Sequence, residues 1–128
     1  MKWIVMVLAG VMAMPLWAQD MQAELAQIQQ RWAQIQYQLP DDDKEKAFES
    51  LAQEAETFVA DYPGRAEPLI WQGIVLSTYA GAKGGLGALG LVKEARASLE
   101  SALKIDPEAL DGSAYTSLGS LYYQVPGW

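Results

Sequence analysis

The chain has 128 residues, contains no histidine and no cysteine, and carries a formal net charge of −7. These absences exclude imidazole general bases, thiolate nucleophiles, disulfides and the usual zinc ligands, so we expect no enzyme activity, no cofactor and no metal site. The basic residues do not cluster into a stripe within this acidic chain, which argues against nucleic acid as a partner.

The first residues have the pattern of a secretory signal peptide. Lys2 supplies one positive charge, residues 3–14 are almost wholly apolar, and the segment ends on the small residue Ala18. A bilayer-spanning helix needs roughly 20 apolar residues, whereas this run breaks at Pro15, and an uncleaved anchor is the alternative. We expect residues 1–18 to be removed by cleavage after Ala18, which predicts a periplasmic or secreted protein without a stable membrane anchor.

Two helices are expected in residues 19–62, where they would form an N-terminal hairpin. The first spans residues 21–38 and is ended by Pro40, because apolar residues recur there at three- and four-residue spacing. The three aspartates at 41–43 then supply a side-chain cap and negative charge for the second helix. A calcium loop would need alternating ligands and a glycine turn, and this run has neither. The apolar face of the second helix consists of Phe48, Leu51, Ala52, Ala55, Phe58 and Val59.

Three further helices follow. The third begins near Ala66 and tolerates Pro68 in its first turn. The fourth covers about 89–105, where the residues with helical spacing are Leu91, Val92, Ala95, Leu99, Ala102 and Leu103. A fifth helix begins near Ser113. The sequence therefore predicts one all-α domain.

The chain also repeats itself. Pro63 and Gly73 recur as Pro107 and Gly119, which gives a repeat of about 45 residues. Helix pairs that recur at such a distance indicate an α-solenoid, in which each hairpin buries its apolar face against a neighbouring hairpin. In both copies the glycine is expected to let the paired helix approach closely.

Two sets of positions resemble the tetratricopeptide repeat (TPR). Its second-helix pattern is matched by Ala95, Leu99, Ala102 and Pro107, and its first-helix pattern by Tyr115, Leu118, Gly119 and Tyr122. The resemblance covers about residues 61–123 and implies antiparallel helical hairpins stacked as a short TPR-like α-solenoid. Residues 63–110 would then be one repeat, and residues 111–128 the first helix of a further, incomplete repeat. A truncated parent or a cover supplied by another molecule would each explain that incompleteness.

Residues 84–90 contain the GxGxxG spacing of dinucleotide-binding loops. Such a loop follows a parallel strand within a βαβ unit, and no segment downstream of Lys104 resembles a strand. The repeat exceeds the family's usual length by roughly ten residues, so we predict that residues 79–90 form an enlarged, flexible loop between two helices. A partner-binding flap containing Lys83, Leu86 and Leu89 is the alternative.

The resemblance implies an adaptor or scaffold that binds a protein or peptide partner through a concave helical face. In the family that face is built by first helices, which implies these partner-binding residues: Glu67, Ile70, Ile74, Thr78, Thr116, Ser120 and Tyr123. One alternative is a self-assembling structural subunit, and therefore a homo-oligomer. The layout is also similar to helical-repeat accessory proteins of transporters, which would bind a small ligand but commonly carry a lipidated cysteine that this chain lacks.

Overall fold

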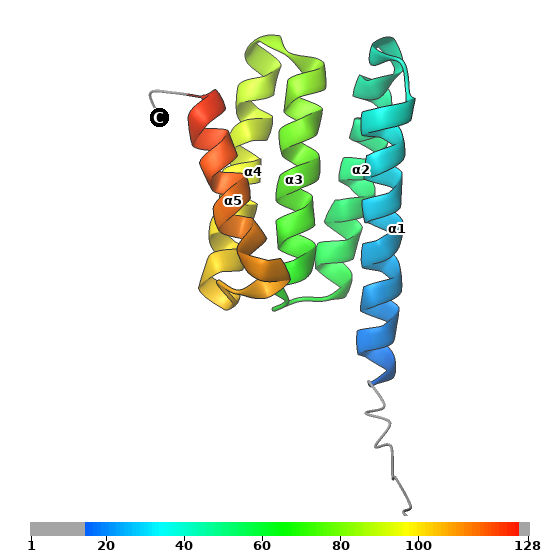
Figure 1. Ribbon diagram of the computed structural model, residues 1–128, viewed down its shortest axis with the longest axis vertical. Coiled ribbons are helices and arrows are strands. Elements are labelled where there is room, and N and C mark those ends of the chain that lie inside the picture. Colours follow the sequence, from blue (N-terminus) through cyan, green and yellow to red (C-terminus); the bar gives the residue numbers. More distant parts are fainter. Residues whose placement is uncertain (1–14, 126–128) are drawn as a thin grey trace, which may run out of the picture.

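The structure of the protein is a computed structural model that describes residues 15–125 (Figure 1). The described residues form helices and connecting turns and contain no strand. The helices are α1 (Leu16–Gln38), α2 (Asp41–Asp61), α3 (Ala66–Lys83), α4 (Gly85–Ile105) and α5 (Ala109–Gln124). The prediction of an all-α fold is therefore confirmed.

One proline and three aspartates determine the turn between α1 and α2. Pro40 lies between the helices, and its ring prevents α1 from continuing. The expected side-chain cap is wrong, because α2 begins at Asp41 itself and no side chain caps it. The three aspartates instead occupy the first turn, where their charge favours the positive end of the helix.

The turn between α3 and α4 is much shorter than expected. We predicted a loop over residues 79–90, but α3 continues to Lys83 and α4 begins at Gly85, so only Gly84 connects them. Gly84 has φ 65° and ψ −179°, a conformation that is almost restricted to glycine. Its N–H donates to the carbonyl of Ala80 at 2.9 Å. The residues expected to form a loop therefore lengthen the two helices.

The start of α5 is irregular. Leu110, Asp111 and Gly112 have positive φ angles, so the first residues of α5 are separated from the rest by a kink. The Ser113 hydroxyl donates to the carbonyl of Leu110 across this kink. Regular helix begins at Ser113, as the sequence predicts.

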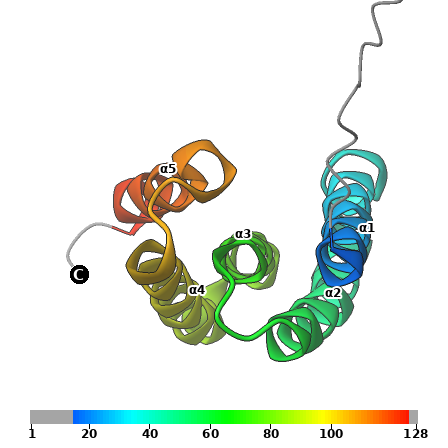
Figure 2. The same ribbon diagram turned by 90° about the horizontal axis from the view of Figure 1, so that it is seen from below.

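The helices follow a curved path, with α3 on the inside and α2 and α4 on the outside (Figure 2). Each helix packs against its neighbour in sequence, and α3 packs against all four others. Two apolar clusters result. One joins α1 and α2 to Val75 and Tyr79 of α3, and the other joins the remaining buried side of α3 to α4 and α5. The helix α3 therefore belongs to both halves of the core.

The two repeated glycines have different surroundings. A Cβ atom built on Gly73 would lie 2.5 Å from Cγ of Leu99, so the missing side chain allows α4 to pack closely on α3, as expected. A Cβ atom on Gly119 would have no described atom within 4 Å. The same expectation is therefore wrong for Gly119, because no described helix packs on that face of α5.

The amino-terminal predictions are only partly covered by the structure. Residues 1–14 of the predicted signal peptide lie outside the described residues. The segment from Leu16 to the proposed cleavage position at Ala18 forms the first turn of α1, where the ring of Trp17 lies 5.4 Å from the Arg65 guanidinium carbon. Within residues 15–125, no helix is long and apolar enough to cross a membrane.

Candidate functional site

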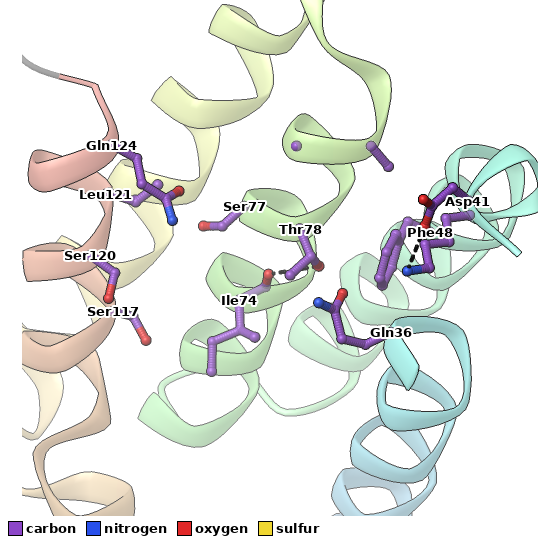
Figure 3. Close-up of a pocket in the computed structure, with 13 residues that line it drawn as sticks. Gln36, Asp41, Phe48, Ile74, Ser77, Thr78, Ser117, Ser120, Leu121 and Gln124 are labelled. Carbon is purple, nitrogen blue, oxygen red and sulfur yellow. Dashed lines mark hydrogen bonds and ion pairs between the residues drawn. The ribbon is translucent and has the colours of Figure 1, made fainter. Parts of the chain in front are cut away.

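A groove with a volume of about 550 Å³ lies on the inner side of the curve (Figure 3). Its floor is α3, one wall is the end of α1 with the start of α2, and the other wall is α5. The backbones of the two walls are separate, because α1 and α2 make no backbone contact with α5 among the described helices. The residues that line this inner groove are Gln36, Asp41, Lys44, Phe48, Ile74, Ser77, Thr78, Gly81, Ala82, Ser117, Ser120, Leu121 and Gln124.

The helical repeat of α3 produces the floor. Ile74, Ser77, Thr78 and Gly81 are three or four residues apart, so they share one face of the helix. The Ser77 hydroxyl donates to the carbonyl of Gly73 at 2.7 Å, and the Thr78 hydroxyl donates to the carbonyl of Ile74 at 3.1 Å. These bonds satisfy the hydroxyl protons within the helix, and the oxygen of Ser77 can still accept a hydrogen bond from a bound molecule.

Thr78 also connects the floor to the first hairpin. The indole N–H of Trp32 donates to the Thr78 hydroxyl oxygen at 3.1 Å. The Trp32 ring is held edge-on by Tyr37 and Trp71, with centroids 5.9 and 5.7 Å away. This contact fixes α1 against α3 and thereby the width of the inner groove.

We expect Thr78→Val to lower the free energy of unfolding by about 1–3 kcal/mol, because valine keeps the shape of threonine but leaves the indole N–H without its acceptor. Thr116→Val is the matched control. Thr116 is exposed on α5, and the same substitution there should change stability by less than about 0.5 kcal/mol. Urea denaturation followed by circular dichroism measures both values. Equal values for the two variants would show that the Trp32–Thr78 contact adds no stability.

The groove is polar but nearly neutral. Its only charged lining residues are Lys44 and Asp41, which form an ion pair at 3.0 Å. The other polar groups are hydroxyls and the amides of Gln36 and Gln124, and Figure 3 shows both amides near the open space. Phe48 and Leu121 lie behind opposite walls and are almost fully buried, so the apolar side chains with accessible surface are those of Ile74 and Ala82. Such a lining suits a ligand that has uncharged hydrogen-bonding groups and small apolar side chains.

Of the seven partner-binding residues predicted from the sequence, three line the inner groove: Ile74, Thr78 and Ser120. Thr116 and Tyr123 are exposed on α5 but lie outside the groove lining. On α5 the lining follows residues 117, 120, 121 and 124. The predicted set of 116, 120 and 123 is therefore displaced by about one position, which corresponds to a rotation of roughly 100° on a helix.

The remaining two predicted residues lie at the start of α3 and do not face the groove. Ile70 has no exposed surface, so its expected role in partner binding is wrong and it is a core residue. Glu67 is half-buried and accepts a hydrogen bond from Arg65 at 3.2 Å. The carboxylate is thus paired within the protein and does not line the groove.

Sequence reasoning missed the first wall of the groove. Gln36, Asp41, Lys44 and Phe48 come from the end of α1 and the start of α2. A signal for them exists, because the turn at Pro40 is short and places both helix ends together. The resemblance implies a binding face built by first helices only, and it therefore does not predict a contribution from α2.

The groups whose pKa is shifted lie outside this groove. Burial raises the pKa of the Tyr62 phenol, and the neighbouring carboxylates of Glu24 and Asp20 raise it further. The hydrogen bond from Arg96 to Glu100, at 2.8 Å, raises the pKa of the Arg96 guanidinium. In the part of the chain that the structure describes, no group of three acidic side chains is placed to hold a metal ion.

The fold and the groove together define an all-helical protein with a polar, nearly neutral groove on the inside of a helical curve. No protein-family model matches the chain, and no curated protein or solved structure is significantly similar to it.

Proposed function

We propose that this protein is an exported TPR-like interaction module that binds a segment of a partner protein in the inner groove. The observation that carries the proposal is the lining itself. Three helical segments that are distant in sequence bring hydroxyls, side-chain amides and apolar groups to one open surface. Export is expected from the signal-peptide pattern of residues 1–18.

The chemistry of the groove favours a polypeptide of low charge. A peptide backbone presents N–H and C=O groups at regular spacing, which the Ser77 and Ser120 hydroxyls and the Gln36 amide can pair with. The Lys44–Asp41 pair adds no net charge to this surface. Ile74, which is half-buried on the floor of the groove, would contact an apolar side chain of the partner.

Two alternative functions can be distinguished from peptide binding by experiment. The groove volume of about 550 Å³ is within the range of small-molecule sites, which favours the alternative of a small-ligand accessory protein. Self-assembly would appear as a concentration-dependent mass in light scattering.

A random-peptide display library is the probe for the proposed function. Peptides would be selected on the full chain, synthesised and titrated against the protein by fluorescence anisotropy. Ser120→Trp places a large ring on the α5 wall of the groove and should weaken the selected peptides at least about tenfold. Ser101→Trp, the same substitution at an exposed position of α4, should leave their affinity unchanged.

Circular dichroism would first establish that both tryptophan variants keep the helical fold. Peptides that bind the Ser120→Trp and Ser101→Trp variants equally well would contradict binding in the inner groove. Failure to select any peptide, together with a small molecule retained by the purified protein, would favour the small-ligand alternative.

A further inference from the structure

A second groove lies on the opposite side of α3. The outer helices α2 and α4 each pack on α3 but make no backbone contact with each other among the described helices. The space between them has a volume of about 410 Å³. Its lining residues are Glu49, Ala52, Gln53, Glu56, Gln72, Leu76, Tyr79, Leu91, Glu94, Ala97 and Ser98, and we call it the outer groove.

The floor of the outer groove is apolar and well fixed. Leu76 and Tyr79 are more than nine-tenths buried, and Leu91 covers them partly from α4. The Ser98 hydroxyl donates to Oε1 of Gln72 at 2.9 Å, which ties α4 to α3 beside the floor. The groove is therefore set by the packing of three helices rather than by a loop.

The rims of the outer groove are negatively charged. Glu49 and Glu56 lie on the α2 rim, and Glu94 lies on the α4 rim. All three are exposed, no lysine or arginine lines the groove, and within residues 15–125 none of the three forms an ion pair. The inner groove differs, because its one carboxylate is neutralised by Lys44.

The spacing of the glutamates along the α2 rim indicates the shape of the ligand. Glu49 and Glu56 are seven residues apart, which is about 10 Å along a helix. Lysines or arginines seven residues apart on a partner helix would have the same spacing. A helix with a central apolar stripe and basic residues on both flanks would place its stripe on Leu91 and Ala97 and its cations beside the rims.

We propose that the outer groove is a second docking site, and that its ligand is a basic amphipathic helix of a partner protein. The apolar floor and the uncompensated acidic rims each select one feature of that helix. The rims give charge complementarity and speed association, while the floor provides the area that excludes water.

The probe for this site is a fluorescein-labelled leucine–lysine amphipathic peptide of about five helical turns. Its binding to the full chain would be followed by anisotropy at low ionic strength, because salt screens exposed charges. A second peptide with the leucines replaced by serines has the same charge but no apolar stripe. We expect it to bind at least about tenfold more weakly than the leucine–lysine peptide.

Two triple variants distinguish the effect of the groove glutamates from the effect of the protein's overall negative charge. The groove variant combines Glu49→Gln, Glu56→Gln and Glu94→Gln. The control variant combines Glu54→Gln, Asp61→Asn and Glu108→Gln, which lie outside the groove lining and remove the same charge. The groove variant should bind the leucine–lysine peptide at least about tenfold more weakly than the wild type, and the control should differ by less than about twofold.

Ala97→Trp provides a test that leaves the charge unchanged. Ala97 is exposed in the groove lining, so the indole would fill the space without disturbing the core and should also weaken the leucine–lysine peptide at least about fivefold. Ser120→Trp, which blocks the inner groove, should leave this peptide unaffected. Circular dichroism checks the fold of each variant. Equal losses in the two triple variants, or full binding by Ala97→Trp, would overturn the proposal.

Discussion

Replacing Leu99 with alanine should lower the free energy of unfolding by about 2–5 kcal/mol, which is a large fraction of the stability of a small domain. Leu99 has no exposed surface, and its side chain fills the space above Gly73 between α3 and α4. Truncation would leave a cavity there, since Gly73 has no side chain that could move into it. Thermal or urea denaturation followed by circular dichroism measures the loss.

Leu86→Ala is the matched control for this prediction. Leu86 is 94% exposed on the first turn of α4, so the same truncation there removes no packing and should change stability by less than about 0.5 kcal/mol. If Leu99→Ala were as mild as Leu86→Ala, the contact between α3 and α4 would not be part of the core.

Gly73→Ala should destabilise the protein by about 1–3 kcal/mol, although alanine is the better helix former by about 1 kcal/mol. The added Cβ would lie 2.5 Å from Cγ and 2.8 Å from Cδ2 of Leu99, which is closer than real contacts allow. Gly119→Ala makes the same change at the repeated position, where no described atom lies within 4 Å. There only the helix preference acts, and we expect a gain of up to about 1 kcal/mol.

The double variant Gly73→Ala with Leu99→Ala identifies the cause. Without the leucine side chain the added methyl has room, so Gly73→Ala should become neutral or stabilising in that background. A double-mutant cycle measures this reversal as a coupling energy. If the cost of Gly73→Ala were the same with and without Leu99, its origin would lie elsewhere than in this contact.

Strong chain breakers made most of the fold predictable. Pro40, Pro63 and Pro107 lie between successive helices, and apolar spacing identified the buried faces of α2 and α4. The sequence did not predict the tight turn at Gly84. Four glycines within residues 84–90 lower the helix propensity of this segment, and a low helix propensity favours the prediction of a loop. In the folded protein one glycine makes the whole turn, and the tertiary packing of α4 on α3 maintains helix through the others.

The inner groove was less predictable than the fold. The resemblance to the repeat predicts which helices face inward, but the angle at which neighbouring helices pack sets the face that each helix presents. On α3 that angle directs Ile70 into the core and Ser77 into the groove. The contribution of α2 depends on how the first hairpin packs against α3, which a single repeat pattern does not specify.

The position of α3 in both apolar clusters sets an order of folding events as the chain is synthesised. The core between α1 and α2 includes Val75 and Tyr79, and the indole of Trp32 finds its acceptor only at Thr78. The helices α1 and α2 can pack on each other, but their shared core is completed only after α3 has been synthesised. Until then the apolar face of the hairpin that packs on Val75 and Tyr79 has no partner, so a chaperone or protease can reach it in the interval between the synthesis of residue 62 and that of residue 79.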